Sequence, residues 1–178
     1  MSLATFQSTV FINQGFGVPG EMFTDAPFQV QTYTINSAEQ AYNIIGATAC
    51  TVTSQGFCQA GSGGSFGFAG ILVNPKNQAL FGFNGIPLEP TLQINNYSPA
   101  ALATMGVMIV TLPASCNIGD YVVYNNTTGV LSTISPTTPL PSGYSFANAI
   151  VTNFTPSTSG TQLAVITINP TYIIPQPV

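Results

Sequence analysis

The stretch Gly63-Gly64-Ser65-Phe66-Gly67 has the G-x-S-x-G spacing of a nucleophile elbow, a strained turn that exposes a serine for acyl transfer. That chemistry needs a histidine base, and the chain contains no histidine. Lys76 is the only other candidate base, and nothing in the sequence pairs it with the serine. The glycines are not followed by Gly-Lys-Ser/Thr, so they do not form a phosphate-binding loop. We therefore predict that the chain is not an enzyme.

Two carboxylates, Glu21 and Asp25, lie four residues apart, a spacing that suits acid–base chemistry or calcium binding. No further acidic residue lies near them in the sequence, which favours a solvated or interface pair. Cys50, Cys58 and Cys116 show no metal-ligand spacing, and without histidine a zinc site lacks its usual donors. We expect reduced, partly buried thiols, with a Cys50–Cys58 bridge as the alternative, and neither metal nor cofactor.

Charge is the unusual feature of the composition. Of the 178 residues, 3% are charged, with one Lys or Arg, five Asp or Glu, and a net charge of −4, whereas soluble domains carry about 25%. With a single cationic residue and a negative net charge, we predict no binding to nucleic acid or to an anionic membrane surface. The longest apolar-rich stretch, residues 99–114, is shorter than the roughly 20 residues that span a bilayer, and residues 1–7 do not resemble a secretory signal.

Strand signals dominate the chain and centre on residues 105–134. There Met105–Leu112 and Asp120–Asn125 are β-branched and aromatic, and Asn126-Thr-Thr-Gly129 supplies a turn into Val130–Ile134. Short helical turns are expected at Asn36–Ala41 and at Ser98–Ala103, from weak capping patterns. The sequence predicts an all-β protein with a single small β-barrel or sandwich domain. Further strands are expected at residues 28–35, 48–53, 66–73, 79–83, 91–94, 145–151 and 162–168.

An extended N-terminal arm, residues 1–27, precedes the β domain at 28–170, and an extended tail follows at 171–178. Glycine and proline break the arm while phenylalanine, valine, isoleucine and methionine make it apolar. Exposed apolar segments commonly mark partner surfaces. The two alternatives are that the arm binds a partner or that it wraps its own domain.

The stretch Gly119-Asp-Tyr-Val-Val-Tyr-Asn-Asn-Thr-Thr-Gly-Val-Leu131 resembles the G-D-x-V-x-Y-(N/D)-x-x-x-G-x-(L/V) hairpin of tailed-phage capsid decoration proteins. Further segments resemble the phage structural cement proteins, in the same order along the chain. These segments are Val18–Glu21, Tyr42–Gly46, Phe68–Lys76, Thr104–Gly106, Val110–Pro113 and Ser145–Ala149. The chain differs from the family members with which we compare it in having fewer charged residues.

The resemblance implies a non-enzymatic protein of the outer capsid surface, assembled in the host cytoplasm, that binds the major capsid protein and cements neighbouring capsomers. It also implies a homo-oligomer, most often a trimer at threefold or quasi-threefold sites. In this interpretation the arm around Glu21–Phe28 and the Pro-rich loop Ser135–Gly143 are the candidate interfaces. The candidate interface residues are Phe11, Phe16, Pro19, Glu21, Met22, Phe23, Asp25, Phe28, Pro139 and Pro141.

Two other classes of function fit the composition. One is a different virion component, such as a tail module or a minor capsid subunit. The other is a carbohydrate-binding β-sandwich, in which tyrosines would stack on sugar rings. The tyrosines considered are Tyr97, Tyr121, Tyr124 and Tyr144.

Overall fold

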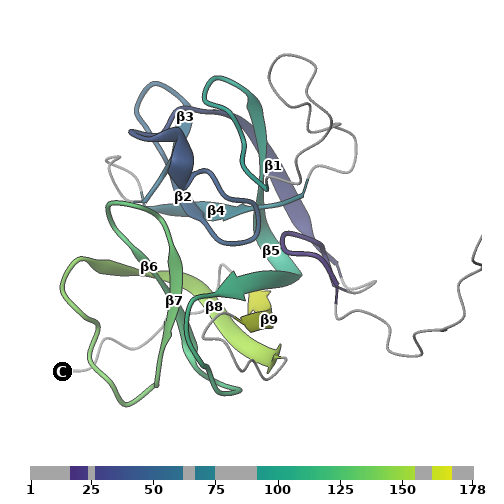
Figure 1. Cartoon of the computed structure of the whole chain (residues 1–178), viewed down its shortest axis with the longest axis vertical. Helices are drawn as coiled ribbons and strands as arrows, with labels where there is room; N and C mark the ends of the chain where they lie inside the picture. The colour runs from purple at the N-terminus through teal and green to yellow at the C-terminus, as the bar shows by residue number, and fades with distance from the viewer. Residues whose placement is uncertain (1–16, 24–26, 62–66, 75–91, 155–161, 170–178) are drawn as a thin grey trace, which may run out of the picture.

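The computed structural model describes residues 17–23, 27–61, 67–74, 92–154 and 162–169 (Figure 1). Within these ranges the chain is nearly all strand, with one three-residue 3-10 turn, η1, at Gln40–Tyr42, so the all-β prediction is confirmed. The strands are β1 (Gln29–Ile35), β2 (Ala49–Val52), β3 (Phe57–Ala60), β4 (Phe68–Leu72), β5 (Pro99–Leu112), β6 (Tyr121–Asn125), β7 (Leu131–Ile134), β8 (Tyr144–Phe154) and β9 (Gln162–Ile168).

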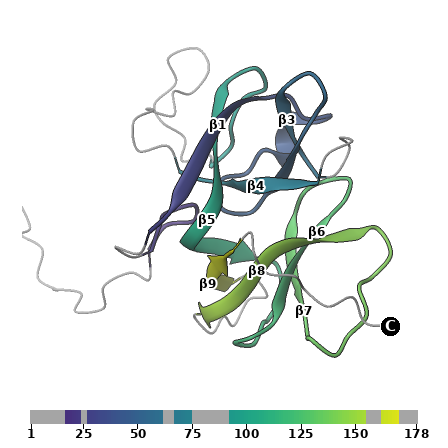
Figure 2. The same ribbon diagram turned by 180° about the vertical axis from the view of Figure 1, so that it is seen from behind.

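The strands form two sheets that share the long strand β5. Their order is β1-β3-β2-β4-β5-β9-β8-β6-β7, and β1 also pairs with β5. This extra pairing closes β1, β3, β2, β4 and β5 into a five-stranded barrel, in which β1 and β3 run parallel. The second sheet continues from the far half of β5 through β9, β8, β6 and β7. Figures 1 and 2 show the barrel above this second sheet, with β5 running from one to the other.

Each sheet buries its own apolar cluster, as the two-residue period of a strand requires. Leu72 and Leu102 point into the barrel, while their neighbours Ile71 and Ala103 point outward, against the second sheet. The outward cluster joins Met108, Val110 and Leu112 of β5 to the inner faces of β6, β8 and β9. The second sheet therefore packs on the outside of the barrel wall.

Strand β5 begins six residues earlier than the sequence predicts. The expected helical turn at Ser98–Ala103 is wrong, because Pro99–Ala103 pairs with β1 on one edge and Ala103 and Leu102 pair with β4 on the other. Proline at the first position of a strand costs no ladder hydrogen bond, since the donor it lacks is not needed there. Burial between two strands overrides the local helical preference of Ala and Leu.

Residues 17–23, the described part of the predicted arm, pair with β5 of the same chain. Gly20 N–H donates to Ile109 O at 2.8 Å, Ile109 N–H to Glu21 O at 2.8 Å, and Phe23 N–H to Val107 O at 2.8 Å. Further along the same edge of β5, Thr111 N–H donates to Gly46 O at 2.8 Å. For this segment, the alternative in which the arm packs on its own domain is the one observed.

A network of side-chain amides ties the loop before β5 to the segment after β1. Asn43, which is fully buried, donates through Nδ2 to Ile94 O at 3.0 Å and to Asn96 Oδ1 at 2.8 Å. Asn96 also donates through Nδ2 to Ser37 O at 2.9 Å. Ser37 was expected to cap a helical turn; instead its Oγ accepts the N–H of Ala60 at 2.8 Å, and η1 starts later without a side-chain cap.

All three cysteines are free and buried, so the structure does not contain the Cys50–Cys58 disulfide that was considered as the alternative. Cys50 and Cys58 lie on the paired strands β2 and β3 and both point into the barrel. Hydrogen bonding to Cys58, followed by burial, raises the pKa of Cys50. Burial, together with nearby Asp120, raises the pKa of Cys116.

We therefore expect the native protein to react with Ellman's reagent at pH 8 far more slowly than a free thiol does. Only the thiolate attacks the reagent. Burial hides all three sulfurs, and the raised pKa values of Cys50 and Cys116 also disfavour the thiolate there, whereas the hydrogen bond with Cys50 lowers the pKa of Cys58. Three thiols should titrate once the chain is unfolded in guanidinium. Rapid reaction of the native protein, or a single thiol after unfolding, would contradict the buried, unbridged arrangement.

Candidate functional site

The structure divides the sequence-predicted interface residues between two separate surfaces. The N-terminal set lies along β5, whereas Pro139 and Pro141 lie in the loop between β7 and β8. In Figures 1 and 2 the purple N-terminal segment and the green β7–β8 loop occupy opposite sides of the molecule. Phe11, Phe16 and Asp25 lie outside the described residues, so the Glu21–Asp25 pair is not described either.

The N-terminal surface is apolar: Met22 and Phe28 meet over Gly106, and Phe23 is held beside β5 by its hydrogen bond to Val107 O. These three residues are here called the Phe patch. Phe28 is 57% and Phe23 41% exposed, while Met22 packs partly against the core. Gly106 has a φ of +127°, and a Cβ there would lie 2.7 Å from both Met22 Cε and Phe28 Cβ. Glycine thus lets the strand bend beneath these side chains and brings them together.

Pro19 and Glu21 flank this patch and are half-buried. Pro19 packs against Gly46, where a Cβ would lie 2.8 Å from Pro19 Cβ. The backbone of Glu21 closes a turn by donating to Val18 O at 3.1 Å, and Val18 is 47% exposed. The exposed groups of this surface are therefore mainly apolar side chains.

The β7–β8 loop exposes Pro139 and Pro141 on a compact turn. Thr138 N–H donates to Ser135 O at 2.9 Å, and Tyr144 N–H donates to Pro141 O at 3.2 Å. The loop base is fixed by Asn126 N–H, which donates to Gly143 O at 2.8 Å. Prolines restrict the backbone, so this exposed turn loses little conformational entropy on contact with a partner.

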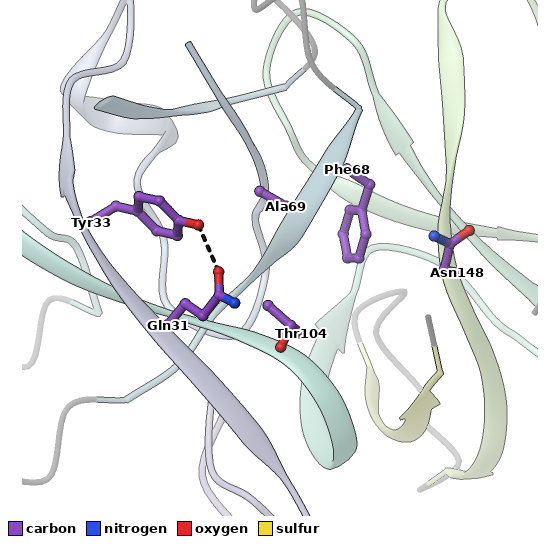
Figure 3. Close-up of a pocket in the computed structure, with 6 residues that line it drawn as sticks. All are labelled: Gln31, Tyr33, Phe68, Ala69, Thr104 and Asn148. Carbon is purple, nitrogen blue, oxygen red and sulfur yellow. Dashed lines mark hydrogen bonds between the residues drawn. The ribbon is translucent and has the colours of Figure 1, made fainter. Parts of the chain in front are cut away.

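A third feature, the open end of the barrel, was not predicted from the sequence. A cavity of about 250 Å³ lies between β1, β4, β5 and β8 and is here called the barrel mouth. Figure 3 shows the residues that line it. Tyr33 Oη donates to Gln31 Oε1 at 2.6 Å in its wall. Six residues from four strands form the lining, so no local pattern could have found them. They are Gln31, Tyr33, Phe68, Ala69, Thr104 and Asn148.

The tyrosines proposed for sugar stacking do not form one surface. Tyr124 is 2% exposed, and burial raises its pKa, so its ring is not available to a ligand. Tyr121 is half-buried and contacts Phe146 edge-on, with ring centroids 6.1 Å apart. Tyr97 is 71% exposed and has a φ of 66°, in the loop held by Asn96. Tyr97 alone among the four presents most of its ring to solvent.

Charge is nearly absent from the described residues. The acids among them are Glu21, Glu39 and Asp120, and no lysine, arginine or histidine falls within the described ranges. Asp120 is 8% exposed and accepts the N–H of Asn117 through Oδ2 at 2.8 Å, which fixes the turn before β6. No group of three potential metal ligands occurs in the described part of the chain. The single three-residue 3-10 turn found there is far too short to cross a bilayer.

Comparison with known proteins identifies the family. A family model described as structural cement protein (E217 gp24/Pam3 gp6) matches residues 6–169. A solved structure titled "The capsid of Myoviridae Phage XM1" contains a chain of similar fold, with a TM-score of 0.59 and 16% identity, covering 94% of this chain and 99% of that chain. No curated protein sequence matches the chain. The family model covers far more than half of the chain, which therefore belongs to the phage structural cement protein family.

Proposed function

We propose that this protein binds the outside of a phage capsid and stabilises the contacts between neighbouring capsomers. It acts as a homo-oligomer, most simply a trimer at threefold or quasi-threefold sites, and its partner is the major capsid protein. It works without catalysis, as a part of the assembled virion that joins the shell in the host cytoplasm. The observation that carries this proposal is the family match over residues 6–169.

The described surface supports a contact of this kind. The Phe patch exposes Phe23 and Phe28, and no lysine or arginine lies in the described ranges. Burying apolar surface contributes about 25 cal/mol per Å², less the cost of ordering the partners. Symmetry then multiplies a modest contact, because each bound subunit of an oligomer raises the effective concentration of the next.

The direct test adds purified protein to undecorated capsids and sediments the mixture. We expect the protein to pellet with the shells, and cryo-microscopy of the pellet to show density on their outer face between capsomers. A protein that stays in the supernatant at micromolar concentration, or that binds only inside the shell, would contradict the proposal.

Binding should change little with salt. Screening weakens interactions between exposed charges, and this chain offers one cation and five acids in all. The same sedimentation assay at 50 mM and 500 mM NaCl should give dissociation constants within about threefold of each other. A loss of tenfold or more at high salt would show that charged contacts, not apolar ones, hold the protein to the shell.

A further inference from the structure

Strand β1 pairs with neighbours along only part of its length. On one edge it pairs with β5 from Gln29 to Thr34. On the other edge its pairing with β3 is confined to Thr34 and Ile35. Among the described strands, none lies beside Val30–Tyr33 on that edge. Within the described part of the chain, this stretch of β1 therefore has an unpaired edge, here called the open edge.

Two residues whose backbone groups face this edge can be identified from the hydrogen bonds at the end of β1. Ile35 N–H donates to Ser98 O at 3.0 Å, so Ile35 bonds toward β5, while Asn36 N–H donates to Cys58 O at 2.8 Å, toward β3. Strand backbones alternate in direction. Val30 and Thr32 therefore direct their N–H and C=O groups away from β5, toward the open edge.

The barrel mouth lies beside the same edge. Gln31 and Tyr33 of β1 line the cavity of about 250 Å³, with Ala69 of β4 and Thr104 of β5 opposite them (Figure 3). A second cavity, of about 510 Å³, shares Tyr33, Phe68 and Ala69 and extends to the β2–β3 turn. Some domains bind a peptide as an added strand at a sheet edge. Such an edge offers unpaired backbone N–H and C=O groups, and a neighbouring pocket receives side chains of the added strand.

We propose that this edge and the barrel mouth receive an added strand from residues 1–16 of a second copy of the chain. The inference rests on the proposed function, for which it specifies how the copies hold one another. Residues 1–16 carry no charged side chain, and the mouth carries none, so neither side loses an ion's hydration on contact. In an extended strand Phe6, Val10 and Ile12 share one face, which would point into the mouth.

The proposed oligomer makes a second copy the source of the strand, and the length of the segment before Gly17 allows it. Gly17 lies against Ile109 of β5, five positions along the strand from Thr104, which lines the mouth. Sixteen extended residues reach about 50 Å, which is enough to cross to a neighbouring subunit. Exchange of an identical segment between copies is a low-cost way to form a symmetric oligomer.

The test places a photoreactive benzoylphenylalanine at Phe6 of the full chain, on the face that would enter the mouth, and mixes ¹⁴N- and ¹⁵N-labelled copies. After irradiation, in solution and on sedimented shells, we expect cross-linked peptides that join residue 6 to residues 27–35 or 67–74 and that carry both isotopes. Cross-links of one isotope only would show that the segment covers the mouth of its own chain, and cross-links elsewhere, or to the capsid protein alone, would also overturn the proposal.

Thr32→Pro is the decisive variant, because proline removes the N–H on the open edge without affecting the pairs of Gln31 and Tyr33 with β5. It should lower the yield of mixed cross-links at least tenfold, whereas Thr32→Val, which keeps the N–H, should retain it. A reciprocal probe at Tyr33 should capture residues 1–16 and does not depend on the fold of the proline variant. Shell binding that persists without mixed cross-links would overturn this inference alone; absence of shell binding would overturn the proposed function instead.

Discussion

A chain that lacks residues 1–16 is expected to keep its fold and to lose at least tenfold in affinity for undecorated capsids. The deleted segment holds Phe6, Phe11 and Phe16 and no charge, so its contribution to a contact is apolar burial. The cut falls before Gly17 because residues 17–23 pair with β5 and belong to the folded core. Sedimentation with shells measures the affinity, and far-ultraviolet circular dichroism checks that the strand signal is unchanged.

A matched control separates the apolar side chains from the length of the segment. The full-length triple variant with Phe6, Phe11 and Phe16 changed to Ser keeps the backbone and should bind almost as weakly as the deletion. If the deletion binds as well as the intact protein, the segment supports shell binding neither directly nor by joining copies of the chain, and the Phe patch and the β7–β8 loop remain as the candidate contacts. If the triple variant binds normally while the deletion does not, backbone pairing carries the contact.

Gly46→Ala is expected to be the most damaging small substitution in the fold. Gly46 has a φ of +69°, and a Cβ there would lie 2.3 Å from Gly20 N and 2.6 Å from Pro19 C, both of which are backbone atoms. Its own N–H and C=O bind Leu72 and Thr111, so the residue has no room to shift. We expect a loss of about 3 kcal/mol or more, which would lower Tm by roughly 6–12 °C.

Gly56→Ala supplies the control for that measurement. Gly56 also has a left-handed backbone, with a φ of +82°, but nothing lies within 4 Å of the position of its Cβ. Its substitution should lower the free energy of unfolding only by the strain of placing alanine in the left-handed backbone region, about 1–2 kcal/mol. Equal effects of the two substitutions in urea denaturation would show that the contact between Gly46 and the Pro19–Gly20 backbone does not stabilise the fold.

The strands that the sequence predicts correctly are those with dense β-branched or aromatic residues. The hairpin of β6 and β7 agrees with the prediction to within a residue at each end, and Gly129 lies at its turn with a φ of +73°. Strand β9 is found at its predicted bounds. In these places local chemistry and final structure agree, because turn residues and strand residues are cleanly separated along the chain.

The elements that sequence reasoning missed depend on contacts with distant residues. Phe57–Ala60 becomes β3 by pairing with β2 and with β1, although none of the predicted strands covers these residues. Residues 92–94 form only an isolated bridge between Ile44 and Gln93 instead of a strand. The barrel mouth is the extreme case, because Gln31, Thr104 and Asn148 meet only after the barrel has closed and β8 has packed beside it.

Strand β5 gives the molecule a particular response to mechanical load. Its 14 residues run without interruption from the barrel into the second sheet, so a pull between the two is carried along a covalent backbone. Seven consecutive residue pairs join β5 to β9, and six join it to β1. Since ladder hydrogen bonds lie across the strand, such a pull loads many of them in shear at once. Single-molecule stretching along this axis should therefore show one high-force rupture, with no earlier separation of the two sheets.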